Sequence, residues 1–270
     1  MRNALIKCLS VAILWGAFQA LFFLGVSDEL LLSDMILEFG FSEVAFLTVY
    51  LIELSIKLLP YFLFQILFGT YIYQHFCTAS IYYFSRRPNR VKWFIAECGK
   101  LYLFAFIYPF MMVISGTAVA SITNQIMFDK ESLILLIYYV LIHSLWLFLT
   151  ALLMNMIAIK LDSSYGFVVV VGLQFAFVSM LLLWENVWPL VDTPNLIKHV
   201  FLLKLNPISH LILAWHSSPI AELNERLNYL NIDFSLNASV IAFFIASIAM
   251  IVVGCIVVKK QEWITFNTER

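Results

Sequence analysis

"SVIAFFIASIAMIVVGCIVV", residues 239–258, runs for twenty residues without a charge. A helix of about 20 residues rises about 30 Å, which is the thickness of the hydrocarbon core of a bilayer. The stretch therefore predicts a membrane-spanning helix. The whole chain agrees, because it is 63% hydrophobic and only 12% charged, whereas soluble domains carry about 25% charged residues. A chain so poor in charge cannot cover a soluble surface, so we expect lipid around it.

Five further segments are long and apolar enough to cross the membrane in the same way. The first of them is followed by no small-residue cleavage site, so we expect a retained span rather than a signal peptide. The predicted fold is therefore an all-α polytopic membrane protein, a single transmembrane domain of residues 1–270 with six transmembrane helices. Their approximate bounds are 8–26, 44–72, 101–121, 132–159, 166–184 and 239–258.

Lysine and arginine predict the orientation, because the cytoplasmic loops of membrane proteins hold an excess of both. With the N-terminus inside, eleven of them lie in cytoplasmic segments and four in outer segments. We therefore expect both termini in the cytoplasm and a multi-pass protein of the cell membrane, in contact with its lipid. The four cysteines have no metal-ligand spacing and are interpreted as free thiols.

The densest cluster of positive charge is "FSRRPNRVKW", residues 84–93, on the predicted cytoplasmic side. It falls within a predicted coupling loop of about residues 73–100, which also carries several aromatic side chains. Pro88 favours the first turn of a new helix, so we expect a turn at residues 87–89. The segment is either an anchor for anionic headgroups or a docking surface for a cytoplasmic partner. The net charge of −1 argues against nucleic acid as that partner.

Ionisable side chains within a span are costly in lipid, which makes them candidates for function. Glu53 and Lys57 lie four residues apart in the second span, with the glutamate first, which is the better order for a helical pair. The pair either neutralises itself as a structural contact or lines a translocation path. His143 is a further path candidate, and both it and Asn155 also suit a hydrogen bond between helices.

Residues 185–238 are too polar to form a clean span and too apolar to form a free loop. "NLIKHVFLLKLNPISHLILAWH", residues 195–216, contains two apolar runs, each about half a bilayer long. This pattern predicts a half-embedded outer hairpin before the last helix, with Trp215 at the membrane interface. "PIAELNERLNYL", residues 219–230, predicts a small surface helix. A lipid-facing hairpin and a cap over a translocation route both fit the pattern.

Sequence signatures of catalysis and of cofactor binding are missing. The chain has no G-x-x-x-x-G-K-[ST] loop for ATP phosphates, no H-E-x-x-H zinc helix and no G-x-S-x-G nucleophile elbow. His210 and His216 lie six residues apart, which does not place them on one helical face, so we expect no metal site there. We therefore expect no enzyme activity, no metal and no cofactor in this chain.

The layout resembles the permease subunit of type-2 ABC exporters. Six spans with both ends inside, a basic and aromatic loop after the second span, and a half-embedded hairpin before the last span are typical of that family. "FCTASIYYFSRRPNRVKW", residues 76–93, is similar to its Arg-rich loop, and "LNPISHLILAWH", residues 205–216, to its Asn-Pro stretch. Only about seven residues precede the first predicted span, so we expect the elbow helix of many family members to be missing or very short.

The resemblance implies a subunit that dimerises with a second copy or a homologue and exports a peptide, lipid or drug-like cargo. A separate cytoplasmic ATP-binding subunit would hold the ATP and the Mg²⁺. The docking residues for that subunit would be Tyr82, Tyr83, Arg86, Arg87, Arg90 and Trp93. Two other functions stay open: a secondary carrier driven by an ion gradient, with Glu53 as its titrating group, and a non-transporting immunity or scaffold subunit.

Overall fold

A computed structural model describes residues 2–25, 29–40, 47–82, 89–187, 201, 203–228 and 232–261. Within these ranges six helical stretches are long and apolar enough to cross a membrane, which confirms the predicted all-α polytopic fold. The second of these stretches combines two helices, α3 and α4. The long helices that form these stretches are α1 (Arg2–Phe23), α3 (Leu47–Phe68), α4 (Tyr71–Tyr82), α5 (Arg90–Ala120), α6 (Lys130–Lys160), α7 (Ser163–Val187) and α10 (Leu236–Lys260).

Helix α5 begins about eleven residues before the span predicted from hydropathy. Asn89 precedes it as the N-cap, and its side-chain oxygen accepts a hydrogen bond of 3.1 Å from the backbone N–H of Lys92. A capped helix starts where its first free N–H groups find a partner, and not where the chain becomes apolar. The predicted coupling loop of residues 73–100 is therefore mostly helix. Residues 83–88, between α4 and α5, lie outside the described residues.

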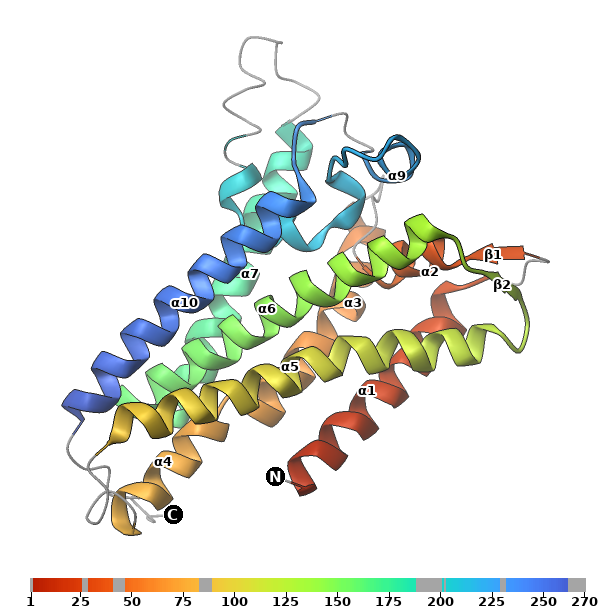
Figure 1. Cartoon of the computed structure of the whole chain (residues 1–270). Helices are drawn as coiled ribbons and strands as arrows, with labels where there is room; N and C mark the ends of the chain where they lie inside the picture. The colour runs from red at the N-terminus through yellow and green to blue at the C-terminus, as the bar shows by residue number, and fades with distance from the viewer. Residues whose placement is uncertain are drawn as a thin grey trace.

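Helix α6 occupies the middle of the bundle and packs against α3, α4, α5, α7 and α10. Helix α1 packs along α5 on one side. The beginning of α1 and the end of α10 lie at the same end of the bundle as α4, as an even number of spans requires (Figure 1). We refer to this as the α4 end, and to the other as the opposite end.

Two glycines bring the backbones of α1 and α5 together. A side chain at Gly16 would collide with the backbone of Met112, and one at Gly116 would collide with the ring of Phe39. Close approach through small residues is the usual way for membrane helices to gain packing energy, because lipid gives them no hydrophobic drive to associate. The α1–α5 pair therefore moves most readily as one unit.

The opposite end holds the smaller elements. Strands β1 (Glu29–Leu31) and β2 (Gln125–Met127) pair in parallel, next to the short helix α2 (Leu32–Phe39). The predicted surface helix is present as α9 (Ala221–Leu227). The segment before it makes two 3-10 turns, Ser209–Leu211 and Leu213–Trp215, and packs against the bundle. The prediction of an interfacial Trp215 is wrong, because its side chain is buried within the protein.

Candidate functional site

The α4 end carries two helices, α4 and α5, that a buried carboxylate joins. Glu97 of α5 lies with its side chain 5% exposed, 2.9 Å from the ring nitrogen Nδ1 of His75 on α4. Its other oxygen accepts a hydrogen bond of 2.6 Å from Nζ of Lys100. His75 and Lys100 are each about two-fifths exposed, so the network links a buried carboxylate to an imidazole and an ammonium group that both reach solvent. We call α4, the first three turns of α5 and the connection between them the α4–α5 arm.

Two of the predicted docking residues hold this arm in place. Trp93 is half-buried and packs against Phe76 of α4, with ring centroids 5.9 Å apart. The guanidinium of Arg90 donates a hydrogen bond to the backbone oxygen of Gln261, just beyond the end of α10. Both residues are therefore engaged within the chain. Their predicted docking role stays a prediction.

The other predicted docking residues lie in or beside the connection of the arm. Tyr82 is the last residue of α4, and its side chain lies outside the described residues, as do Tyr83, Arg86 and Arg87 altogether. The structure therefore fixes the base of the connection at Tyr82 and Asn89. The docking role of the four residues stays a prediction.

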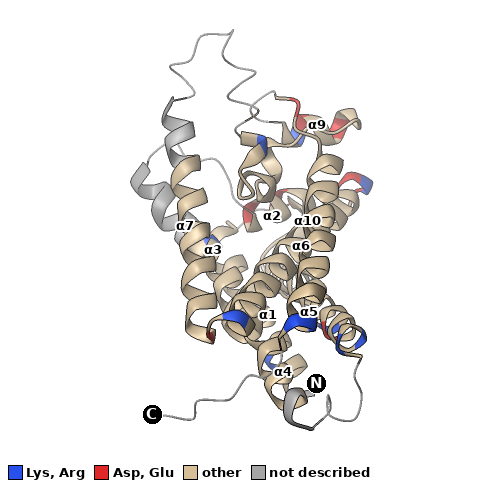
Figure 2. Ribbon diagram, turned by 90° about the vertical axis from the view of Figure 1, so that its left-hand side faces the viewer, with Lys and Arg blue, Asp and Glu red and all other residues tan. Residues whose placement is uncertain are grey.

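Charge separates clearly between the two ends of the bundle (Figure 2). At the α4 end the described residues are mainly basic, and at the opposite end they are mainly acidic. The first group contains Lys7, Arg90, Lys92, Lys100, Lys160, Lys259 and Lys260 beside Glu97 and Asp162. The second contains Glu29, Asp34, Glu38, Asp129, Glu131, Glu222, Glu225 and Asp233 beside Lys130, Lys204 and Arg226. This is the pattern that the positive-inside rule associates with a cytoplasmic α4 end.

The second span is interrupted at Gly69 and Thr70, between α3 and α4. Asn155 of α6 bridges the interruption: its side-chain nitrogen donates to the oxygen of Phe68 at 2.8 Å. Its side-chain oxygen accepts from the backbone N–H of Tyr73 at 3.0 Å. The expected interhelical hydrogen bond of Asn155 is thus confirmed. It satisfies backbone groups that a break in a helix leaves free, which is necessary where no water is present.

Lys57 is buried in α3, with a side chain 1% exposed. Its Nζ lies 3.9 Å from Glu38 of α2 and 5.1 Å from the centroid of the Phe23 ring of α1. The side chain of Glu53 lies outside the described residues, so the Glu53–Lys57 pair stays a prediction. Glu38 was missed because it lies in another helix, and no local spacing in the sequence predicts such a contact.

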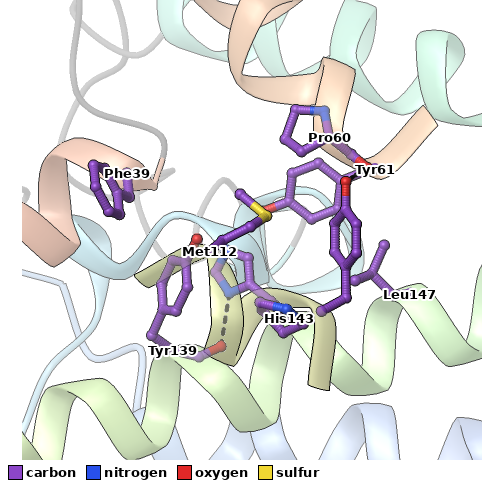
Figure 3. A pocket seen from close by; sticks show the side chains of 9 residues that line it. Phe39, Pro60, Tyr61, Met112, Tyr139, His143 and Leu147 are labelled. Atoms are coloured by element: carbon purple, nitrogen blue, oxygen red, sulfur yellow. Dashed lines mark hydrogen bonds between the residues drawn. The ribbon is translucent and has the colours of Figure 1, made fainter. Parts of the chain in front are cut away.

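His143, the third path candidate, lies at a small cavity in the centre of the bundle (Figure 3). Its Nδ1 donates to the backbone oxygen of Tyr139 at 2.9 Å, and the two rings stack with centroids 4.1 Å apart. Its Nε2 has no hydrogen-bond partner among the described residues. Tyr61 and Pro60 of α3 close the cavity from the other side. At about 10 Å³ this cavity is far too small for cargo.

A much larger groove of about 720 Å³ lies between α6, α7 and α10. Ligand pockets typically occupy about 300–1,000 Å³, so its size suits a small molecule or an acyl chain. Its walls are apolar apart from Thr150, Gln174 and, in the last turn of α6, Lys160. Pro207 contributes to the lining from the segment between α7 and α10. No sequence pattern marked this groove, because its wall is shared by three separate helices.

Comparison of this chain with known proteins finds no match. The sequence matches no protein-family model and no curated protein, and the structure matches no solved structure. In the part of the chain that the structure describes, no cluster of three or more histidine, cysteine, aspartate or glutamate residues could hold a metal ion.

Proposed function

We propose that this chain is the membrane-spanning permease subunit of an ATP-driven exporter of the type-2 ABC kind. It would act with a second copy or a homologue, and a separate ATP-binding subunit would dock on the connection between α4 and α5. The observation that carries the proposal is the construction of the arm. Its two helices are joined by Glu97, tied to the end of α10 by Arg90, and joined by a short connection that contains Arg86 and Arg87.

Such an arm can transmit movement because α5 continues as one helix through the bundle. Its 31 residues, Arg90–Ala120, correspond to about 46 Å at 1.5 Å per residue. Movement of the connection therefore tilts the opposite end of α5. Helix α1 follows, because the contact at Gly16 and Gly116 leaves no space between the two helices.

The second span supplies the complementary joint. Pro60 interrupts the hydrogen bonds of α3, and Gly69 with Thr70 separates α3 from α4. Hinges are a few residues at the ends of elements that absorb backbone rotation, and these positions fit that description. Asn155 holds the joint closed in this conformation through its two bonds to the backbone.

The groove between α6, α7 and α10 supports an apolar cargo that reaches the chain from the lipid. Its walls expose almost only apolar surface, and α10 is the least buried of the six candidate spans. Lys160 at its α4 end would attract an acidic group on the cargo. ATP and Mg²⁺ would be held by the partner, whose docking surface we expect to carry carboxylates that complement Arg86 and Arg87.

Paired charge-removal variants test the docking. In Arg86→Ala/Arg87→Ala, two cations leave the connection, and Lys259→Ala/Lys260→Ala removes two cations from the same end of the bundle. Each tagged chain is purified from native membranes, and Mg²⁺-dependent ATP hydrolysis is measured per permease. We expect the wild type and the Lys259/Lys260 variant to hydrolyse ATP. The Arg86/Arg87 variant should lose most of the activity, since arginine contacts concentrate interface energy.

Equal ATP hydrolysis in both double variants would contradict docking at the connection. A wild-type preparation without ATP hydrolysis would contradict the exporter itself. Transport that continues after ATP depletion and stops when ion gradients are collapsed would favour the secondary carrier instead.

A further inference from the structure

The segment 203–217 is joined to α10 by a hydrogen-bond cluster in which Ser239 lies between two imidazole rings. Nδ1 of His210 lies 2.8 Å from Oγ of Ser239, and Nε2 of His216 lies 2.7 Å from the same oxygen. We call residues 203–217 the latch segment. Ser239 and His216 are completely buried, and His210 is 8% exposed.

The outer nitrogens of both rings fix which tautomer is present. Nε2 of His210 lies 2.9 Å from the backbone oxygen of Lys204, and Nδ1 of His216 lies 2.9 Å from that of Ile212. A carbonyl oxygen only accepts, so each of these nitrogens must carry a hydrogen. In the neutral rings the nitrogens that face Ser239 are therefore both acceptors.

The cluster is consequently one hydrogen short. A serine hydroxyl has a single hydrogen to donate, and two acceptors lie within hydrogen-bond distance of it. With both rings neutral, one of the two contacts brings lone pair against lone pair in a buried site. One added proton resolves this: the protonated ring donates to Oγ of Ser239, and the hydroxyl donates to the other ring.

We propose that His210, Ser239 and His216 form a proton-binding site that takes up a single proton shared between the two histidines. The bound proton completes the bonds between the latch segment and α10. Its loss leaves one contact between them repulsive, so the latch segment is held more loosely. A second proton is disfavoured, because it would place two positive charges beside one buried hydroxyl and leave the hydrogen of Ser239 without a partner in the cluster.

Aromatic rings surround the site and favour a cation in it. His216 stacks on Phe234 with centroids 4.3 Å apart, and the ring of His210 stands steeply against the same ring with centroids 4.9 Å apart. Phe243 of α10 lies 5.4 Å from His210. A cation over an aromatic face is attracted by the ring quadrupole, so the Phe234 face on which His216 stacks offsets part of the cost of burying the charge.

The free-energy cost of burying a charged imidazole determines the pH at which the site takes up its proton. Burial lowers the pKa of His216, and the charges of His210 and His143 lower it further, against the opposing effect of the bond to Ile212. Burial likewise lowers the pKa of His210, against the bond to Lys204. We therefore expect uptake below the usual histidine range.

The described elements around the site bring few other charges to it. His143 of α6 is near enough to influence the charge of His216, and Lys204 contacts His210 through its backbone oxygen. On α9 the two glutamates point to solvent and the arginine is paired with Asp129; these residues are Glu222, Glu225 and Arg226.

Neither catalysis nor metal binding explains the cluster better. A serine beside an imidazole is the arrangement of a nucleophile with its base, but a substrate cannot reach an oxygen that is completely buried. A structural metal needs about four ligands, and among the described residues no group of three or more histidine, cysteine, aspartate or glutamate residues could hold a metal ion.

The test counts protons on the isolated chain in lipid, so its outcome does not depend on a partner ATPase. Imidazole ¹⁵N shifts of the histidine-labelled protein are followed from about pH 8 to about pH 3, a range that extends well below the ordinary titration of histidine. We expect the pair to start as one Nε2–H ring and one Nδ1–H ring, and to gain one proton in one transition. Signals are assigned with His210→Asn, whose amide nitrogen replaces Nδ1 as a donor to Ser239. In that variant the amide donates to Oγ of Ser239 and the hydroxyl donates to His216, so the cluster is complete without an added proton. The pH transition should therefore disappear, and His216 should remain neutral.

A serine variant and a matched control complete the experiment. Ser239→Ala removes the shared acceptor, and the transition should move down by about one pH unit, since a hydrogen bond and one unit of pKa are of similar free energy. Ser247→Ala, at a buried serine two turns further along α10, should leave it unchanged. Uptake of no proton or of two protons by the wild type, or an unchanged transition in Ser239→Ala, would overturn the proposal.

Discussion

The α4–α5 arm and the latch segment hold opposite ends of the bundle by opposite means. The arm depends on charge: a buried carboxylate, Glu97, is shared by Lys100 and the imidazole of His75, both about two-fifths exposed. The latch segment depends mainly on polar groups that are nearly all buried, with Asn206 and Ser209 beside the two histidines. Contacts of half-exposed charges weaken as salt rises, whereas buried neutral hydrogen bonds do not. The arm therefore suits exchange with a soluble partner, and the latch segment suits a closure that does not respond to salt.

The largest effect is expected where a buried amide is removed from the latch segment. Asn206 donates to the backbone oxygen of Phe177 on α7 at 2.7 Å and accepts from the N–H of Ile208 at 2.9 Å. Asn206→Ala removes both bonds and leaves the buried N–H of Ile208 without its partner, which should lower the free energy of unfolding by about 2–4 kcal/mol. Asn89→Ala removes one exposed N-cap at the arm and should cost only about 1 kcal/mol. Unfolding in detergent measures both, and equal losses would contradict the difference between the two ends.

Several features of the fold could be predicted from the sequence. The six spans followed from hydropathy alone, because lipid imposes a length and an apolar composition on each helix. The hydrogen bond of Asn155 was also predicted, since a polar side chain in lipid must find a partner. The start of α5 followed from the turn expected at residues 87–89, but its continuity with the third span did not follow from hydropathy.

The polar sites at the two ends were mostly missed, for a physical reason. His210 and His216 were judged unable to act together, since six residues do not return to one face of an α-helix. The structure places them on successive 3-10 turns, so both rings reach Ser239 more than twenty residues later. Contacts of this kind depend on how irregular turns pack against a distant helix, and no periodicity in the sequence reports them.

An intermediate effect is expected at the arm, where salt should distinguish it from the latch segment. Glu97→Gln keeps an acceptor for Lys100 but loses the charge, so we expect a loss of about 1–2 kcal/mol in low salt. That figure already allows for solvent screening of the exposed partners. In about 0.5 M salt the loss should shrink, while the loss in Asn206→Ala should not change. Thermal melting at both salt concentrations measures this. A salt-independent loss in Glu97→Gln would show that the buried carboxylate acts through packing alone.

The smallest effect is expected at an ion pair that is charged, like the contacts of the arm, but lies at the opposite end of the bundle. Arg226 of α9 lies 2.7 Å from Asp129, the N-cap of α6, and also donates to Ser33 at 2.8 Å. Slight burial raises the pKa of Asp129, but bonds from Ser132 and Arg226 outweigh it and hold that pKa below its usual value.

A carboxylate with a lowered pKa in the folded state stabilises the fold at a pH above its unfolded pKa of about 3.9. That contribution disappears as the pH falls through the lower, folded pKa. Because the pair lies at the surface, with side chains 29% and 26% exposed, solvent still screens it, and we expect Asp129→Asn to cost no more than about 1 kcal/mol at neutral pH. The difference between wild type and Asp129→Asn should then narrow below about pH 4, as the wild-type carboxyl also becomes neutral. Melting curves between about pH 7 and about pH 3 measure the difference. If the difference in stability stays constant as the pH falls, the pair stabilises the fold through packing and not through charge. The contacts at this end of the bundle would then all act without charge, as those of the latch segment do.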